Sequence, residues 1–193
     1  NGAAIVNMKT GEVLYKNQMD YLTAEKIIKY GLEMDIMVEV FTNGRAYTLK
    51  RYMTELVEYG VNPRFTEWLK DTRETVESFS DILNNDSTIE NINLIFSDMD
   101  KRDEMRKYLL ACPDVELTNS IVNNLEVGVK NCSKGATLEI LAEMLGTDMS
   151  RVMCLGDNDN DCDMLKRAGI SIGMENGQDC VKHGVTYVAK NNN

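Results

Sequence analysis

The residues best suited to chemistry form an acidic segment in the last third of the chain. Gly156–Asp163 reads Gly-Asp-Asn-Asp-Asn-Asp-Cys-Asp, and it follows the apolar run Val152–Leu155 and precedes a helical pattern. Carboxylates at the carboxyl end of a parallel strand provide the hard oxygen ligands that Mg²⁺ prefers. The alternative is a set of solvated aspartates that stabilise the start of a helix.

A calcium-binding loop of the EF-hand type is a second alternative for the acidic segment, but the sequence does not match the residues that such a loop requires. Asp157, Asp159 and Asp161 match its first, third and fifth positions. The sixth position, where the loop needs glycine, is Cys162, and the twelfth, where it needs glutamate, is Ala168.

A lysine at a second helix start complements the acidic segment. Lys134 follows Ser133, a good N-cap, in the first turn of a helix predicted by the spacing of Leu138, Leu141 and Leu145. A lysine is unfavourable there unless an anion is present, because the helix start carries partial positive charge. Lys134 and the acidic segment together would bracket a phosphate.

The elements that must position these residues alternate between strand and helix after Val129. Strands are expected at Val152–Leu155, Ile170–Gly173 and Val185–Val188, with a helix around Met164–Ala168 and a short helix near Gln178–Lys182. This order predicts an α/β fold with a parallel sheet. We expect Asn191–Asn193 to be loop.

The preceding part of the chain has a mixed pattern with hairpin connections. Residues 3–15 predict a hairpin, and Thr23 is a plausible N-cap for a following helix. Further expected elements are strands at 36–41, 46–49, 92–96, 115–117 and 125–129, and helices at 50–59, 76–83 and around 105–109.

Composition excludes several classes of protein. The chain has 193 residues, is 43% hydrophobic and carries a formal net charge of −10, which would repel a phosphate backbone and argues against nucleic acid as a partner. It has no apolar run of about 18 residues and no basic, signal-like start, so neither a membrane span nor a secretion signal is expected. We expect a cytoplasmic protein, and the sequence leaves the oligomeric state open.

The cysteines and the single histidine suggest no metal or disulfide framework. Cys112, Cys132, Cys154, Cys162 and Cys180 are odd in number and widely spaced, so we expect buried free thiols. His183 is the only histidine and is expected at the surface.

Three segments together resemble a known family. They are Ser133-Lys134-Gly135, the run from Val152 through Gly-Asp-Asn-Asp-Asn-Asp to Leu165, and Gly173-Met-Glu-Asn-Gly177. These residues are similar to the C-terminal half of Cof-type phosphatases, in subfamily IIB of the haloacid dehalogenase-like superfamily, and Asn1–Tyr15 resembles the hairpin ahead of the family's cap. The resemblance implies a partial Rossmann-like parallel-sheet core at 1–19 and 128–193, with an α/β cap domain inserted at 20–127.

The resemblance also implies roles for individual residues. Asp157 would bind Mg²⁺, Lys134 would hold the phosphoryl oxygens, and Asn160 would hydrogen-bond the phosphate. Asp161 would orient Lys134 or a metal-bound water. Charge neutralisation and positioning of this kind are what phosphoryl transfer needs.

The family's nucleophile motif, DxDGT, does not occur in the sequence. Asp98-Met-Asp100 imitates it but continues with Lys101-Arg102, and Val40–Arg45 imitates the family's second motif in the wrong order. We interpret both segments as cap structure. The nucleophile is expected ahead of Asn1, in a longer protein, and this chain alone is predicted to be inactive.

The sequence therefore predicts a Mg²⁺-dependent phosphatase of small phosphorylated metabolites such as sugar phosphates, acting through an aspartyl-phosphate. Two alternatives stay open. One is a non-catalytic remnant that binds a phosphorylated ligand or a partner, and the other is a plain acidic cation-binding domain.

Overall fold

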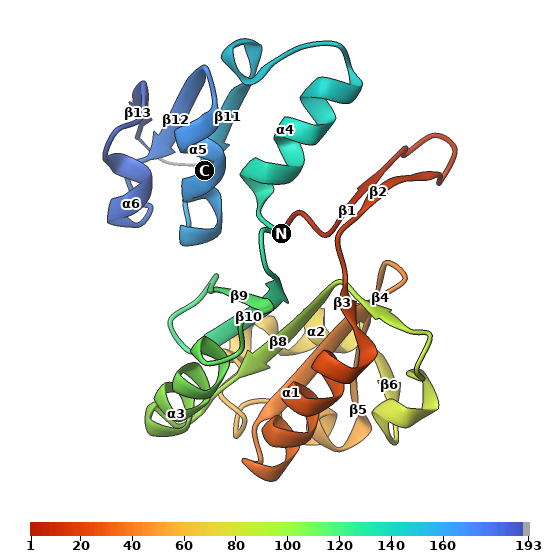
Figure 1. Ribbon diagram of the computed structural model, residues 1–193. Coiled ribbons are helices and arrows are strands. Elements are labelled where there is room, and N and C mark those ends of the chain that lie inside the picture. Colours follow the sequence, from red (N-terminus) through yellow and green to blue (C-terminus); the bar gives the residue numbers. More distant parts are fainter. Residues whose placement is uncertain (191–193) are drawn as a thin grey trace. The chain divides into compact units, whose positions relative to one another are not determined.

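The apolar runs and helical patterns of the chain fold into two units in the computed structural model, which describes residues 1–190 (Figure 1). Asn1–Asn17, Thr118–Ser120 and the chain from Asn131 onward form one unit, here called the core unit. Gln18–Leu117 and Ile121–Lys130 form the other, here called the inserted unit. The predicted loop at Asn191–Asn193 lies outside the described residues. The role of the inserted unit as a cap stays a prediction.

The core unit is built on a short parallel sheet and the hairpin that begins the chain. Its strands pair in the order β11-β12-β13, both pairs parallel, and β1 pairs antiparallel with β2. The elements are β1 (Ala4–Val6), β2 (Val13–Lys16), α4 (Lys134–Met144), β11 (Met153–Gly156), α5 (Cys162–Arg167), β12 (Ile170–Met174), α6 (Asp179–Lys182) and β13 (Tyr187–Ala189), with 3₁₀ turns at Met149–Arg151 and Asp159–Asp161. The parallel strand and helix order predicted after Val129 is confirmed.

One face of this parallel sheet is covered and the other is open. Cys154 of β11, Leu165 of α5 and Val181 of α6 are buried together. The side chains on the opposite face are exposed, among them Met153 and Leu155 of β11. Within residues 1–190, β11 is also an edge strand.

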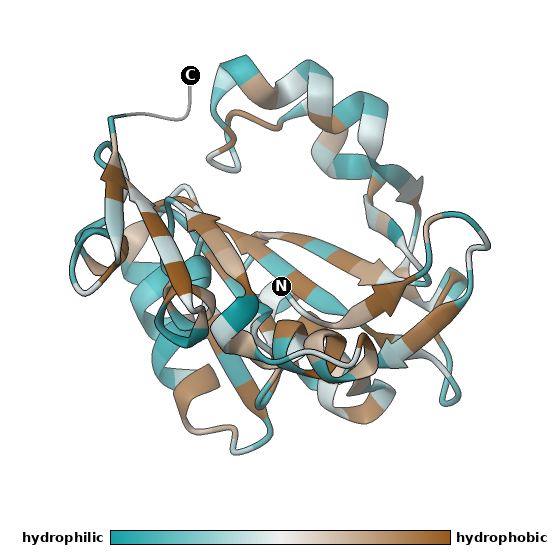
Figure 2. Cartoon of the chain, turned by 90° about the horizontal axis from the view of Figure 1, so that it is seen from above, coloured by the Kyte–Doolittle hydropathy of each residue, from teal (hydrophilic) through white to brown (hydrophobic). Residues whose placement is uncertain are grey.

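The inserted unit contains a six-stranded sheet in the order β6-β5-β4-β8-β10-β9. Its strands are β4 (Met37–Thr42), β5 (Arg45–Leu49), β6 (Glu74–Val76), β8 (Asn91–Ile95), β9 (Val115–Thr118) and β10 (Asn124–Val129), while β3 (Met19–Asp20) and β7 (Thr88–Ile89) form a separate pair. Its helices are α1 (Tyr21–Glu33), α2 (Thr66–Thr72) and α3 (Met99–Leu110), with 3₁₀ turns at Lys50–Thr54, Pro63–Phe65 and Phe79–Asp81. Hydrophobic residues run along the strands of both sheets (Figure 2).

The hairpin expected around Asn43-Gly44 is confirmed. Asn43 and Gly44 have φ of 52° and 72°, the left-handed values that a two-residue hairpin turn needs and that asparagine and glycine tolerate best. Asp98 follows β8 and caps α3 by accepting from the backbone N–H of Asp100, so it lies inside the inserted unit.

Three predicted elements of the inserted unit are wrong in detail. Helix α1 begins at Tyr21 and is capped by Asp20, because the Asp20 carboxylate accepts from both the backbone N–H and the hydroxyl of Thr23. The helix expected at 50–59 is a 3₁₀ turn followed by irregular chain. The helix expected at 76–83 is the end of β6 and a 3₁₀ turn capped by Ser78.

Candidate active site

Helix α4 fixes the position of Lys134. The Ser133 side chain caps the helix by accepting from the backbone N–H of Ala136 at 3.0 Å, so Lys134 is the first helical residue, as predicted. Thr137, one turn further on, donates its hydroxyl to the carbonyl of Gly2 at 2.6 Å and ties α4 to the start of the chain. The lysine side chain is therefore held at a rigid helix start.

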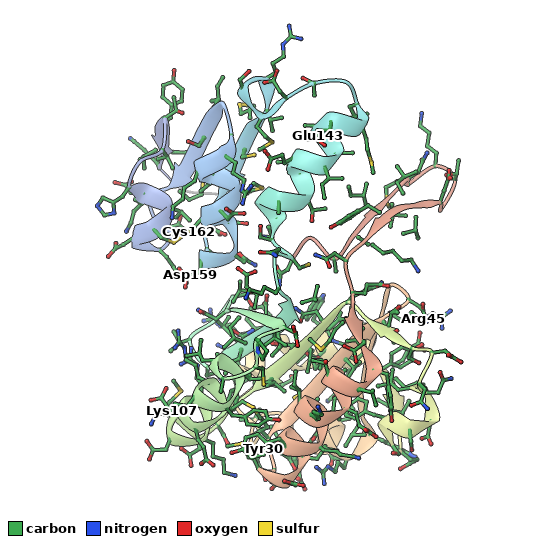
Figure 3. All side chains as sticks on the ribbon, viewed as in Figure 1. Tyr30, Arg45, Lys107, Glu143, Asp159 and Cys162 are labelled. Carbon is green, nitrogen blue, oxygen red and sulfur yellow. A yellow bond between two sulfur atoms is a disulfide. The ribbon has the colours of Figure 1, made fainter. Side chains whose placement is uncertain are left out.

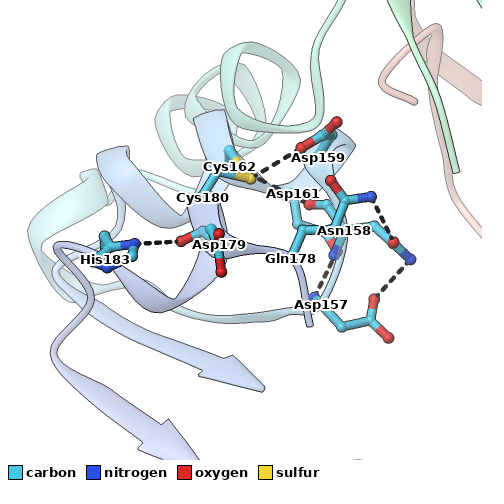
Figure 4. The surroundings of a disulfide bond; sticks show 9 residues. All are labelled: Asp157, Asn158, Asp159, Asp161, Cys162, Gln178, Asp179, Cys180 and His183. Atoms are coloured by element: carbon cyan, nitrogen blue, oxygen red, sulfur yellow. Dashed lines mark hydrogen bonds between the residues drawn. A yellow bond between two sulfur atoms is a disulfide. The ribbon is translucent and has the colours of Figure 1, made fainter. Parts of the chain in front are cut away.

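Asp161 is the residue around which the acidic segment is organised (Figure 4). It is buried, and its Oδ1 lies 2.5 Å from Lys134 Nζ. Its Oδ2 accepts from the backbone N–H groups of Asp157 and Asn158 at 3.0 and 3.3 Å. The lysine and the acidic loop, inferred as partners from sequence, are thus in direct contact.

Asp157 lies directly after β11, at the carboxyl end of the strand. Its carbonyl accepts from the backbone N–H of Gln178 at 3.0 Å, and its Oδ1 accepts from the side chain of Asn158 at 3.2 Å. The segment 157–161 is therefore fixed on one side by Asp161 and on the other by the chain that leads into α6. Asp157 is half-buried, and its carboxylate is a suitable oxygen ligand for Mg²⁺.

Asn160 belongs to the same loop as Asp157 and Asp161, but its side chain contacts a distant part of the chain. Its side-chain nitrogen donates to Oδ1 of Asn1 at 3.0 Å, across 159 residues of sequence. The four residues predicted for the site, Lys134, Asp157, Asn160 and Asp161, all belong to the core unit and gather around one loop. Their roles stay predictions.

Two residues of the site were not assigned a role from sequence. Asp163 accepts from the hydroxyl of Ser133 and from Nε of Arg167, the latter at 2.9 Å, and so links the starts of α4 and α5. Gln178 holds Asp157 through the backbone contact above. The contacts of Asp163 with Ser133 and of Gln178 with Asp157 join segments that are distant in sequence. In the sequence, only the position of Asp163 two residues after Asp161 indicated that it could belong to the site.

The environment of Asp163 lowers the pKa of its carboxyl. Partial burial is the largest single influence and raises this pKa, but the hydrogen bonds from Ser133 and Arg167 and the positive charge of Arg167 together outweigh it. The carboxylate is therefore ionised at neutral pH and joins the two helix starts through charged hydrogen bonds.

The expectation that all five cysteines are free thiols is wrong. Cys162 and Cys180 form a disulfide, while Cys112, Cys132 and Cys154 are thiols. Spacing in sequence gave no indication of the bond, because the fold brings the starts of α5 and α6 together. Figure 3 places Asp159 and Cys162 near the start of α5. Asp159 lies beside both sulfurs, but sulfurs bonded to each other do not offer thiolate ligands to a metal.

The fold and site together define a class of protein. A parallel α/β sheet carries an acidic loop at the carboxyl end of a strand, and a lysine at a neighbouring helix start contacts that loop. This is the arrangement of a haloacid dehalogenase-like hydrolase. The sequence pattern that describes haloacid dehalogenase-like hydrolases matches residues 1–193, and the chain belongs to this family of hydrolytic enzymes.

Comparison with individual proteins agrees with this class. The chain is 39% identical over 95 residues to 5-amino-6-(5-phospho-D-ribitylamino)uracil phosphatase YcsE of Bacillus subtilis, a match that covers 49% of this chain and 38% of that protein. It is 26% identical over 220 residues to phosphatase YwpJ of the same organism, covering 98% of this chain and 76% of YwpJ.

A solved structure has the same fold. The structure of a haloacid dehalogenase-like hydrolase from B. subtilis matches with a TM-score of 0.83 and 23% identity, over 97% of this chain and 72% of the other. The α/β fold class is thereby confirmed. Among residues 1–190, no helix combines the length and apolar composition that a membrane crossing requires.

Proposed function

We propose that this chain forms part of a Mg²⁺-dependent phosphatase that hydrolyses monoesters of small phosphorylated metabolites. The observation that carries the proposal is the contact of Lys134 with Asp161, inside the loop that also presents Asp157. A cation and a metal-binding carboxylate side by side are what a phosphoryl group needs for charge neutralisation.

Each of the four residues has a distinct proposed task. Lys134 binds the phosphoryl oxygens with its ammonium group, and Asp161 positions that group. Asn160, whose side-chain nitrogen contacts Asn1 in this structure, would donate a hydrogen bond to the phosphate. Asp157 contributes the carboxylate ligand to the metal.

The donor chemistry of the loop fits Mg²⁺. This ion takes one or two protein carboxylates and completes its shell with water and phosphate oxygens, and Asp157 supplies one such carboxylate at a strand end. When bound, Mg²⁺ would neutralise charge that develops on the phosphoryl group. The proposed aspartyl-phosphate route would use the nucleophilic aspartate of a DxDGT segment.

The substrate class is supported by the name of a relative. YcsE is named for a substrate with a phosphorylated ribityl chain, which is a phosphate ester of a small polyol. We extend this to sugar phosphates and related esters, with the inserted unit as the cap that selects among them. Closure of such a cap would exclude water from the reacting phosphate.

The test is the binding of inorganic phosphate in the presence of Mg²⁺, measured by titration calorimetry on the 193-residue chain. We expect Lys134→Ala to weaken binding about 10- to 100-fold, the value of one hydrogen bond to a charged group at roughly 1.5–3 kcal/mol. The matched control is Lys166→Ala, which removes an exposed lysine from α5. Equal affinity of Lys134→Ala and the control would refute the proposed role of Lys134.

The same titration separates the alternatives. Phosphate binding that requires Mg²⁺ supports either the phosphatase or a phosphate-binding remnant, and hydrolysis of a phosphate monoester distinguishes these two. Cation binding that is indifferent to phosphate would favour a plain cation-binding domain and contradict the proposal.

A further inference from the structure

The disulfide between Cys162 and Cys180 lies next to the site loop and takes no part in the chemistry proposed above. It joins the first residue of α5 to α6, across a sequence separation of 18. Both cysteines are half-buried, so small thiol reagents can reach them. The remaining cysteines differ: Cys132 and Cys154 are buried, and burial raises the pKa of the Cys154 thiol.

Together with the hydrogen bond from the backbone N–H of Gln178 to the carbonyl of Asp157, the disulfide closes a ring that passes through the loop 157–161 (Figure 4). On one side, Cys162 directly follows Asp161, whose carboxylate binds Lys134 and the backbone of the loop. On the other side, Cys180 stands two residues after Gln178, whose backbone N–H donates to the carbonyl of Asp157. The loop 157–161 is thus held between two segments that one covalent bond connects.

The carboxylate of Asp159 lies close to the sulfurs, so reduction of the disulfide would change the electrostatic interactions at this point. Oδ1 of Asp159 lies 3.1 Å from Sγ of Cys180. A bonded pair of sulfurs carries no charge and tolerates a carboxylate at this distance. After reduction the two sulfurs must separate to van der Waals contact, and any thiolate formed there would repel Asp159.

We propose that Cys162 and Cys180 form a reversible thiol–disulfide switch that sets the affinity of the neighbouring loop for phosphate. The disulfide form holds the loop 157–161 in the arrangement described here. The dithiol form releases the start of α6, loosens the loop and binds phosphate more weakly. The phosphate part of the proposal rests on the proposed function, whereas the coupling of the disulfide to the loop does not.

The chemistry needs a low-molecular-weight disulfide, RSSR, as oxidant. The thiolate of one cysteine attacks a sulfur of RSSR, which forms a mixed disulfide and releases one RS⁻. The second cysteine attacks the protein sulfur of the mixed disulfide and releases the other RS⁻. The protein gives up two protons and two electrons, and RSSR becomes two RSH.

The experiment equilibrates the 193-residue chain in buffers of varied ratio of reduced to oxidised glutathione. Samples are quenched by alkylation and mapped by mass spectrometry, and amide hydrogen exchange of the peptide spanning 157–161 is followed on matched samples. Calorimetry with Mg²⁺ and inorganic phosphate is run on both forms. Cys180→Ser serves as a chain that cannot close the ring, and Cys112→Ser, in the inserted unit, is the control.

We expect Cys162 and Cys180 to lose alkylation together in oxidising buffer and to regain it on reduction. Reduction and Cys180→Ser should each speed exchange in the loop and weaken phosphate binding by about fivefold or more, the lower end of typical coupling between linked sites. Cys112→Ser should behave as the unmodified chain.

Two results would overturn the switch. One is alkylation of both cysteines across the whole range of buffers. The other is a disulfide that forms while loop exchange stays the same in both states. Failure of both forms to bind phosphate would instead refute the proposed function, and loop exchange would still decide whether the disulfide controls the loop.

Discussion

Replacing Asp161 with alanine tests the assignment of this residue as the centre of the site loop. The change removes the acceptor for the backbone N–H groups of Asp157 and Asn158 and the partner of Lys134. Each backbone donor left without a partner costs about 1–3 kcal/mol when buried. The ion pair adds less than about 1 kcal/mol, because Lys134 is partly exposed.

The sum is a loss of about 2–7 kcal/mol in the free energy of unfolding of the core unit. With a urea dependence of about 2 kcal/mol per molar, the middle of the usual range, the midpoint of unfolding should fall by roughly 1–3.5 M. Far-ultraviolet circular dichroism follows both units, whereas the fluorescence of the single tryptophan, Trp68, follows the inserted unit. The shift should appear in the first signal and not in the second.

Two variants make the result interpretable. Asp161→Asn keeps one acceptor oxygen and the shape of the side chain, so we expect it to fall between the unmodified chain and Asp161→Ala. Asp179→Ala removes an exposed aspartate paired with Lys182 and should leave the midpoint of unfolding almost unchanged. Equal stability of Asp161→Ala and Asp179→Ala would refute the reasoning.

Three further predictions concern other contacts. Gly177→Ala places a Cβ 2.6 Å from the carbonyl oxygen of Asp157, so it should cost about 1–3 kcal/mol by overpacking and weaken Mg²⁺ binding measured by calorimetry. In the folded chain the pKa of the Asp163 carboxyl lies below its usual 3.8, so as the pH falls this carboxyl is protonated in the unfolded chain first. The Asp163 carboxylate therefore stabilises the fold above pH 3.8, and this stabilisation is lost as the pH falls through the folded pKa. Acid unfolding curves should detect the loss. Arg73→Ala leaves the fully buried Glu39 carboxylate without its ion pair and should cost about 3–5 kcal/mol in urea unfolding followed by fluorescence.

Each of these predictions has its own control. Glu175→Ala, an exposed change close to Gly177, should leave Mg²⁺ binding intact, and equal effects would count against steric displacement of Asp157. Asp163→Asn should flatten the acid limb of the stability curve, and an unchanged limb would exclude Asp163 as its source. Arg45→Ala breaks an exposed ion pair and should cost less than about 1 kcal/mol; a loss as large as that of Arg73→Ala would contradict the burial argument.

Local sequence predicted the core unit well because its determinants are close together in the chain. Ser133 caps the helix that carries Lys134, and the apolar run before Gly156 forms a parallel strand. The inserted unit was harder. The apolar spacing of Phe79 and Leu83 suits a helix, but one 3₁₀ turn is enough to bury both side chains.

The residues of the site could be predicted from the sequence, but their contacts with distant parts of the chain could not. Lys134 and the acidic loop could be paired because each was expected at the start of a helix that packs on the same sheet, and the family resemblance singled out Asp161. Asn160 bonds to Asn1, and Cys162 bonds to Cys180, through proximity that the fold creates. No pattern of neighbouring residues encodes such pairs.

The bond between Thr137 and Gly2 has a consequence for the order in which the chain folds. The two residues are 135 apart, and closing a flexible loop of that length costs about 4 kcal/mol in chain entropy. A folded inserted unit would lower this cost, because its two ends continue into Asn17 and Asn131, and within the core unit the Asn17 carbonyl oxygen lies 3.8 Å from the Cys132 sulfur. The first hairpin leaves the ribosome before α4 exists, so it must wait while the inserted unit folds and returns the chain to it.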